Sequence, residues 1–225
     1  MGVTMTIIII ISIMIFIFWK TRDLKIEWNT FFKKGIDPLD DRFGVYAICG
    51  KQGTYKSFRA IPLIMAQDKN LCNKIKTNMK SLNIPGYEIE YFNKIRDIYY
   101  DTDEYCIYLI DEISRKYDKN SRTDTQFYAW LNQSRKTHRI VILITQEWKE
   151  LPMWLRRPVK FMFTTLRKPV LNRIGLQLTI VGDAYNMALD KDTLEWECPT
   201  IGRILWKPTE IVSKMYDTFE IVNDL

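Results

Sequence analysis

The sequence is poor in the residues that mark several kinds of chain. Its 225 residues include only 9 glycines and 8 prolines, which argues against collagen-like repeats and long disordered linkers. We find no internal repeat. With 47% hydrophobic and 27% charged residues, the chain can bury a sizeable core, and its length suits one domain or one domain with a small extension.

Cysteine and histidine are scarce as well. The four cysteines form no C-x-x-C pair, and two of them lie inside apolar runs. This spacing disfavours a disulfide framework or a zinc site and favours core thiols in a reducing compartment. The single histidine, His138, has no Cys or His companion for metal or nucleophilic chemistry, which favours a structural role. The cysteines are Cys49, Cys72, Cys106 and Cys198.

One long apolar run stands at the N-terminus. Residues 3–19, VTMTIIIIISIMIFIFW, begin at Val3, end at Trp19 and carry no charge. As a helix rising about 1.5 Å per residue, the run covers roughly 26 Å, just enough for a bilayer core. A cleaved signal peptide is the alternative, but no Lys or Arg precedes the run and no small-residue cleavage site follows it. We therefore expect a retained transmembrane anchor over residues 1–19.

Three cations, Lys20, Arg22 and Lys25, follow the run. By the positive-inside rule they place the rest of the chain in the cytoplasm, although a solvated helix end would carry the same charges. We predict a juxtamembrane connector over residues 20–43. The net charge of +6 favours an anionic surface nearby, either lipid headgroups or nucleic acid.

The remainder, residues 44–225, alternates apolar runs with segments compatible with helix. Such alternation is typical of an α/β fold with a mainly parallel sheet flanked by helices. After Arg167 the pattern predicts a hairpin around Gly182 and Asp183, and then a last helix over 209–216. The predicted strands are 44–49, 73–78, 104–111, 139–145 and 159–165, and the predicted helices are 57–68, 123–136 and 151–157.

The stretch GKQGTYKS, residues 50–57, lies between a predicted strand and a predicted helix. This is the context of a phosphate-binding loop of the pattern G-x-x-x-x-G-K-[ST]. Backbone N–H groups in such a loop point at phosphate oxygens, and the helix dipole favours the anion. We expect Lys56 to reach the β- and γ-phosphates of ATP and Ser57 to ligate Mg²⁺. The predicted nucleotide-binding residues are Gly50, Lys51, Gln52, Gly53, Thr54, Tyr55, Lys56 and Ser57.

Tyr55 departs from this pattern, because it stands where the pattern has glycine. A positive φ at that position would strain a tyrosine. Gly53 could supply the missing backbone freedom and leave the Tyr55 ring pointing away from the phosphates. We expect a weak but real ATP site, with an affinity cost of about 1–3 kcal/mol from strain that Tyr55→Gly relieves.

Two further strand ends complete the expected site. CIYLIDEIS ends in Asp111 and Glu112; Asp111 would hold Mg²⁺ through water, and Glu112 would orient the attacking water. An isolated Asp-Glu pair is more often a helix N-cap. RIVILITQ ends at Gln146, which could sense the γ-phosphate or position water, or cap a helix. Together with the loop, these residues indicate a P-loop ATP hydrolase.

The ordered blocks over roughly residues 44–166 resemble the zonula occludens toxin-like (Zot) assembly ATPases of filamentous phages. Besides GKQGTYKS and YLIDEIS, the blocks are IKTNMKSLNIPG, with Thr77, Asn78 and Leu82, and LITQ followed by a short helix with Leu155 and Arg156. The resemblance implies the FtsK/HerA-like branch of P-loop motors, ATP-dependent work on DNA or on virion extrusion, and a homo-oligomeric ring. Two features depart from the family: its members mostly place the membrane span after the ATPase, and Tyr55 replaces glycine.

Three functions remain open at this point. The leading one is a single-pass, membrane-anchored ATPase that powers assembly and export of a filamentous single-stranded DNA phage. It would sit in the host cell membrane with its C-terminal domain in the cytoplasm, and phage DNA and coat proteins would be its partners. The alternatives are a non-hydrolysing membrane scaffold of the same fold and a DNA translocase or packaging motor. The basic clusters QSRKTHR, WLRRPVK and LRKPVLNR could face DNA in a ring pore or the anionic leaflet, or be ordinary surface.

Overall fold

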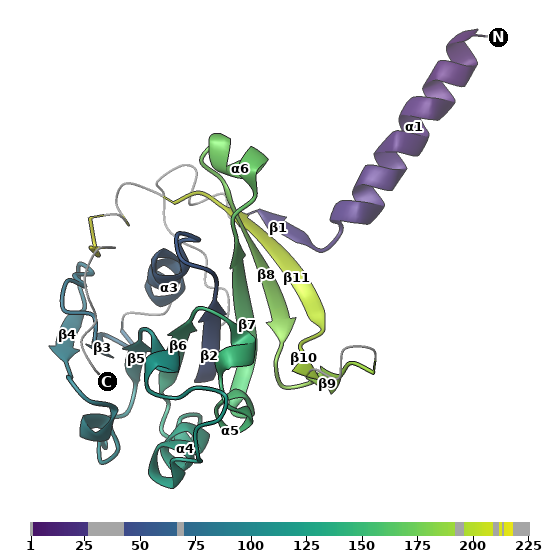
Figure 1. The fold of residues 1–225 in the computed structure, drawn as a ribbon. Coiled ribbons are helices and arrows are strands. Elements are labelled where there is room, and N and C mark those ends of the chain that lie inside the picture. The colour runs from purple at the N-terminus through teal and green to yellow at the C-terminus, as the bar shows by residue number, and fades with distance from the viewer. Residues whose placement is uncertain are drawn as a thin grey trace.

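A computed structural model describes residues 2–26, 43–66, 70–191, 196–208, 212 and 214–217. One nine-stranded sheet organises this part of the chain, in the order β1-β11-β8-β7-β2-β6-β5-β3-β4. Figure 1 shows the sheet with helices on its faces and helix α1 projecting away from it.

Six neighbouring strands of this sheet, from β4 to β7, run parallel to one another. The strands β2, β5 and β6 are buried at every position, which is why their sequences are continuous apolar runs. All five expected strands are confirmed; the sequence did not reveal β4, EIEY, a short edge strand with two charges. The bounds are β2 Gly44–Cys49, β3 Lys74–Thr77, β4 Glu88–Tyr91, β5 Cys106–Ile110, β6 Ile140–Thr145 and β7 Val159–Leu166.

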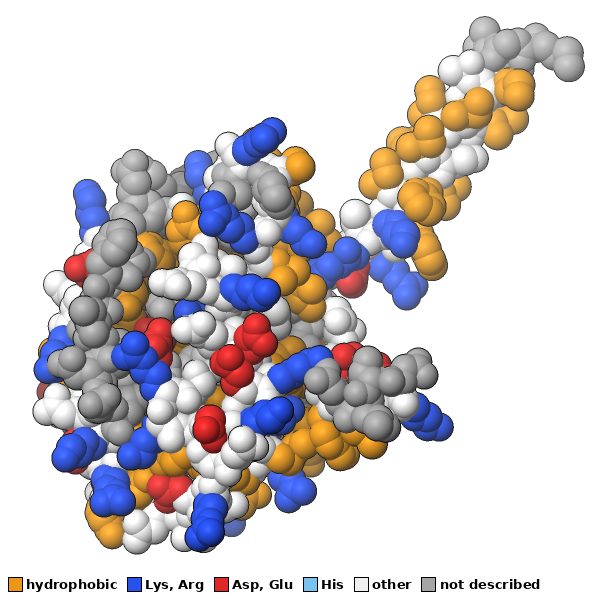
Figure 2. Space-filling view, in the orientation of Figure 1, with side chains coloured by type: hydrophobic (Ala, Val, Ile, Leu, Met, Phe, Trp, Pro, Cys, Tyr) orange, Lys and Arg blue, Asp and Glu red, His pale blue; other side chains and the backbone are white. Residues whose placement is uncertain are grey.

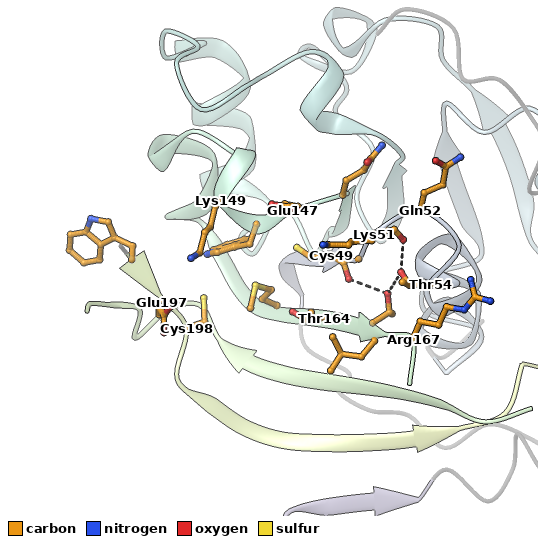
Figure 3. A pocket seen from close by; sticks show the side chains of 17 residues that line it. Cys49, Lys51, Gln52, Thr54, Glu147, Lys149, Thr164, Arg167, Glu197 and Cys198 are labelled. Atoms are coloured by element: carbon orange, nitrogen blue, oxygen red, sulfur yellow. Dashed lines mark hydrogen bonds between the residues drawn. The ribbon is translucent and has the colours of Figure 1, made fainter. Parts of the chain in front are cut away.

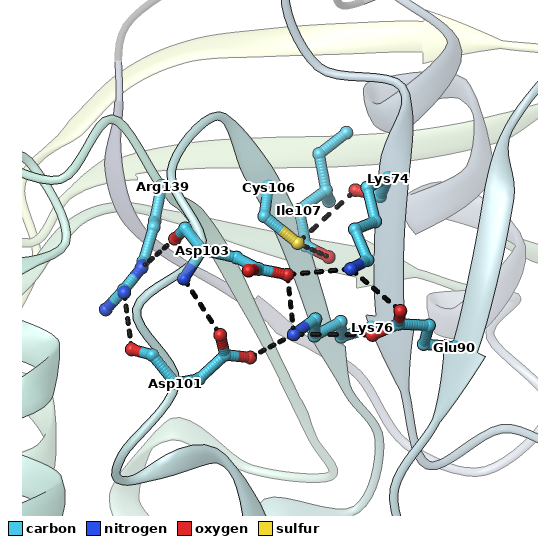
Figure 4. Close-up of polar contacts among 8 residues, drawn as sticks. All are labelled: Lys74, Lys76, Glu90, Asp101, Asp103, Cys106, Ile107 and Arg139. Carbon is cyan, nitrogen blue, oxygen red and sulfur yellow. Dashed lines mark hydrogen bonds and ion pairs between the residues drawn. The ribbon is translucent and has the colours of Figure 1, made fainter.

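Charged side chains stabilise the β3–β4 edge (Figure 4). Lys74 and Lys76 alternate with buried residues of β3 and lie between acidic side chains of β4 and of the segment before β5. Lys74 Nζ is 2.7 Å from both Glu90 Oε1 and Asp103 Oδ2, and Lys76 pairs with Asp101. These lysines lower the pKa of Asp103 to about 2. The network holds the segment before β5 against β3.

The other half of the sheet contains β8 Gln177–Asp183, β11 Thr200–Trp206 and β1 Leu24–Ile26. β8 pairs antiparallel with both β7 and β11. The hairpin expected around Gly182 and Asp183 is therefore wrong, because β8 continues through both residues between two paired neighbours. The turn follows Asp183, whose side chain accepts a hydrogen bond from the Asn186 N–H at 3.1 Å. A separate two-stranded sheet joins β9 Ala188–Leu189 to β10 Trp196–Glu197.

Helices cover both faces of the parallel half, which confirms the α/β fold (Figure 1). Alternate residues of β2 point to opposite faces: Tyr46 and Ile48 pack in the core that includes α3, and Val45 and Ala47 pack in the core that includes α4. The expected helices are confirmed in shorter form as α3 Lys56–Met65, α4 Thr125–Gln133 and α5 Met153–Arg156. The 3₁₀ helices are η1 Ile95–Ile98, η2 Ile113–Arg115 and η3 Trp148–Glu150, and α6 Pro169–Arg173 joins β7 to β8. The helix expected over 209–216 falls mostly outside the described residues.

Helix α1, Gly2–Thr21, covers the apolar N-terminal run. Its side chains from Met5 onward are all exposed, and Figure 2 shows them as an apolar rod outside the globular part. Within the described part of the chain, no helix has both the length and the apolarity needed to cross a membrane. The anchor expected over residues 1–19 is not confirmed and stays a prediction.

The expected connector contributes a strand to the sheet. Directly after α1, β1 pairs parallel with β11, with Leu24 opposite Arg203. The Arg203 guanidinium binds the Asp23 carboxylate, its Nε donating at 3.0 Å, and it also donates to the backbone oxygen of Lys20 at the end of α1. The backbone N–H of Arg203 donates to the backbone oxygen of Asp23 at 3.0 Å. The base of α1 is thereby fixed to the sheet edge. Residues 27–42 lie outside the described part.

Candidate nucleotide-binding site

Residues 50–57 connect β2 to α3 at the carboxyl edge of the parallel strands. The Gly50 N–H donates to the Gln146 backbone oxygen at 3.0 Å, which ties the start of this phosphate loop to the end of β6. A Cβ at Gly50 would lie 2.2 Å from Thr165 Oγ1 and 2.3 Å from Thr54 Oγ1. The first position of the loop therefore has room only for glycine.

Two buried threonines hold the loop against β7 (Figure 3). Thr165 Oγ1 donates to the Cys49 backbone oxygen at 3.1 Å and lies 2.9 Å from Thr54 Oγ1. Thr54 Oγ1 also donates to the Lys51 oxygen at 2.7 Å. The sequence did not reveal the role of Thr165, because its contacts cross from one strand to a loop more than a hundred residues away.

Tyr55 has left-handed backbone geometry, with φ 61° and ψ 32°. Its carbonyl accepts the hydrogen bond from the Arg59 N–H at 2.9 Å, so Tyr55 is the residue from which the loop turns into α3. Gly53 also has a positive φ, 76°. The expectation that Gly53 relieves Tyr55 is wrong, because the loop needs a left-handed residue at both positions. The ring packs edge-on against Phe58 of α3, with centroids 5.6 Å apart.

Asp111 lies at the end of β5, only 3% exposed, and faces the start of α3. Ser57 Oγ donates to Asp111 Oδ2 at 3.2 Å. Asn78, at the end of β3, brackets the Asp111 backbone: its Nδ2 donates to the Asp111 oxygen at 3.0 Å, and its Oδ1 accepts from the Asp111 N–H at 2.8 Å. The fold thus brings together the residue pair that the sequence assigned to Mg²⁺, and it adds Asn78 as the residue that positions Asp111.

Burial raises the pKa of Asp111 to about 6, although the positive charge of Lys56 acts to lower it. A buried carboxylate beside a hydroxyl is a hard-oxygen donor set of the kind that Mg²⁺ prefers. Among the described residues, no group of three or more His, Cys, Asp or Glu side chains could hold a metal ion. An ion at Ser57 and Asp111 would complete its ligands with water and phosphate oxygens, as Mg²⁺ commonly does.

Glu112 and Gln146 line one cavity of about 630 Å³ together with Gln52 of the loop. Glu112 also has a positive φ, 52°, and its carboxylate is paired with Arg115 Nε at 2.6 Å. It makes no capping hydrogen bond through its side chain. The residue that precedes η3 is Glu147 and not Gln146, so neither expected catalytic residue is explained as a helix cap.

A second cavity, of about 670 Å³, adjoins the loop between the ends of β6 and β7 and strand β10. Arg167, the first residue after β7, lies beside the loop: its Nη1 is 4.0 Å from the position of a Cβ on Gly53. Its place two residues after a predicted strand, on the same sheet edge as the loop, was the signal that could have revealed it.

The cysteines are buried or partly buried, and the single histidine packs against a tyrosine. Cys49, Cys72 and Cys106 are buried and Cys198 is partly buried, all four as free thiols. Burial raises the pKa of Cys106 to about 12, which keeps the thiol protonated. His138 stacks on Tyr105 with ring centroids 4.7 Å apart, before the start of β6 and so at the far edge of the sheet from the loop.

No family model and no curated protein matches the chain. The similarity to known proteins is therefore structural. The N-terminal domain of zonular occludens toxin from Neisseria meningitidis aligns with a TM-score of 0.55 and 18% identity, over 78% of this chain and 100% of that domain. This chain has the fold of that domain. The resemblance seen in the sequence blocks is thus matched by the architecture.

A second solved structure aligns less closely. The genome packaging NTPase of Sulfolobus turreted icosahedral virus 2, solved in complex with ATP-γS, gives a TM-score of 0.46 and 15% identity, over 76% of this chain and 99% of that one. At this TM-score it does not inform the function of this chain.

Proposed function

We propose that the chain is a P-loop ATPase that hydrolyses ATP. The observation that carries this proposal is the contact of Ser57 with Asp111 at 3.2 Å, at the junction of a glycine-dependent loop, a helix start and a buried strand end. Two chain segments 54 positions apart in sequence meet there, and each supplies a residue type that phosphoryl transfer needs.

The protein groups have distinct roles in this proposal. The loop N–H groups and Lys56 bind the β- and γ-phosphates. Bound Mg²⁺, held by Ser57 and Asp111, would neutralise charge on the phosphate oxygens. Glu112 orients the attacking water once its carboxylate leaves Arg115, and Gln146, in the same cavity, contacts the water or the γ-phosphate.

The cellular role we propose is assembly and export of a filamentous single-stranded DNA phage, from a single-pass anchor in the host cell membrane with the C-terminal domain in the cytoplasm. Support comes from the likeness to the zonular occludens toxin domain, the exposed apolar α1 and the cations Lys20, Arg22 and Lys25 that follow it. We propose a homo-oligomeric ring that acts on phage DNA and coat proteins.

The test is ATP binding and hydrolysis by the full chain in detergent, with Lys56→Ala beside the matched control Lys136→Ala, at an exposed position that lies outside the loop. We expect Lys56→Ala to weaken ATP binding by tenfold or more, since it removes a charge-assisted contact worth about 1.5–3 kcal/mol. ATP binding as tight as in the parent would refute the loop assignment.

The same assay separates the alternatives. Binding without turnover would favour the non-hydrolysing scaffold. Turnover stimulated by added DNA would favour a translocase or packaging motor.

A further inference from the structure

The connection between β7 and β8 carries an exposed surface that the nucleotide site does not use. Val170 and Ile174, in and just after α6, are 75% and 63% exposed, and Lys168 and Arg173 beside them are exposed as well. We call these four residues the α6 tip. The chain has no acidic residue between Glu150 and Asp183, so the local charge of the tip is entirely positive.

The α6 tip lies at the end of the sheet toward which α1 rises in Figure 1. β8 begins at Gln177, opposite Trp206 of β11, and β11 pairs with β1 at Leu24 opposite Arg203. Three residues along β11 therefore separate the start of β8 from the start of β1, roughly 10 Å at about 3.3 Å per residue. In Figure 1, α1 rises from the sheet toward the end that carries α6, and Figure 2 shows Lys and Arg side chains at both places.

Hydrogen bonds and strand pairing join the base of α1 to the sheet. Arg203 binds both the Asp23 carboxylate and the Lys20 backbone oxygen, and β1 continues directly into the sheet edge. An anchor joined in this way orients the ATPase domain relative to the membrane. A surface at the end of the sheet toward which α1 rises is then presented to the headgroups when α1 is inserted.

We propose that the α6 tip is a second membrane contact, inserted among anionic headgroups beside the anchor. The inference rests on the proposed membrane anchoring. The chemistry of the tip selects lipid over DNA: phosphate contacts with nucleic acid need cations and polar groups, whereas exposed aliphatic side chains between cations match the apolar and charged layers of a membrane interface. Val170 and Ile174 enter the acyl boundary, and Lys168 and Arg173 bind lipid phosphates.

The experiment uses the full chain with Cys198→Ser, since the other three cysteines are buried. Ile174→Cys carries an environment-sensitive fluorophore. The matched control is the same label at Tyr185→Cys, a 79% exposed position that follows the opposite end of β8. The protein is reconstituted into vesicles of phosphatidylcholine and phosphatidylserine in roughly a 3:1 ratio that contain spin-labelled lipid.

We expect a blue-shifted label at position 174 that lipid quenches, and an unquenched label at position 185. Replacing Lys168 and Arg173 with Gln should lower the equilibrium constant for insertion of the tip about 25-fold, at a factor of about five for each cation lost. A chain that floats with vesicles but shows equal, water-like labels at both positions would overturn the tip contact and leave the anchor standing. A chain that does not float would overturn both, and a label at position 174 that responds to single-stranded DNA instead of lipid would assign the surface to DNA.

Discussion

The left-handed backbone at Tyr55 permits a quantitative test of where strain is stored. Tyr55 has φ 61°, the geometry that a glycine would adopt, and its carbonyl accepts a hydrogen bond of the first turn of α3 from the Arg59 N–H. Strain that comes with this turn into α3 lowers the free energy of unfolding and is not added when ATP binds. We therefore expect Tyr55→Gly to change the dissociation constant for ATP by less than about threefold. This expectation replaces the prediction from the sequence that the variant binds ATP more tightly.

Two substitutions of Tyr55 separate the backbone strain from the ring contact in the free energy of unfolding. Tyr55→Ala keeps the left-handed strain and loses the edge contact with Phe58, worth about 0.5–1.5 kcal/mol. Tyr55→Gly loses the same contact. It removes about 1–2 kcal/mol of left-handed strain, but it lowers the free energy of unfolding by about 0.5–1 kcal/mol because glycine gives the unfolded chain more freedom. The glycine variant should thus be more stable than the alanine variant by about 0.5–1 kcal/mol, the difference of the last two terms.

The assay is urea unfolding of the full chain in mild detergent, followed by fluorescence of the buried tryptophans. Tyr100 is the control, because it is 79% exposed and is not among the residues with positive φ. At Tyr100 the order should reverse, with alanine more stable than glycine by about 0.5–1 kcal/mol. If alanine is the more stable substitution at both positions, Tyr55 stores no left-handed strain and the reasoning fails.

Three further predictions concern the hydrolytic groups. Glu112→Gln should keep ATP binding and slow single-turnover hydrolysis by 10²–10⁴-fold, roughly the usual contribution of a general base; equal rates would exclude that role. Arg115→Gln should free the Glu112 carboxylate and raise turnover by up to about fivefold, the value of a half-exposed ion pair, whereas slower turnover in rapid-quench assays would show that Arg115 assists the reaction. Because the pKa of Asp111 is raised to about 6, its folded state binds a proton more tightly than the unfolded chain, so stability falls as pH rises through 4 to 6 while Mg²⁺-dependent hydrolysis rises. Asp111→Asn should abolish hydrolysis, yet at pH 8 its free energy of unfolding should exceed that of the parent by up to about 3 kcal/mol. If the stability of the variant falls between pH 4 and pH 8 by as much as that of the parent, this account is contradicted.

The sequence by itself determined the parallel half of the sheet and the composition of the loop. Strands such as β2 and β6 are buried on both faces, so each is a continuous apolar run that can be read without knowing its neighbours. The residues of GKQGTYKS are consecutive, and Asp111 and Glu112 directly follow a strand. Parallel strands place their carboxyl ends on one edge, which is why the loop and Asp111 could be expected to meet.

Only the tertiary structure decided the features that join distant positions. The contacts of Asn78 with Asp111 and of Thr54 with Thr165 link residues 33 and 111 positions apart, and no local pattern encodes them. The left-handed geometry of Tyr55 follows from the angle at which the loop must enter α3, which the packing of α3 on the sheet sets. The strands β8, β11 and β1 extend the sheet through pairing between segments up to about 180 residues apart, and hydrogen bonds of the backbone leave no mark on side-chain composition.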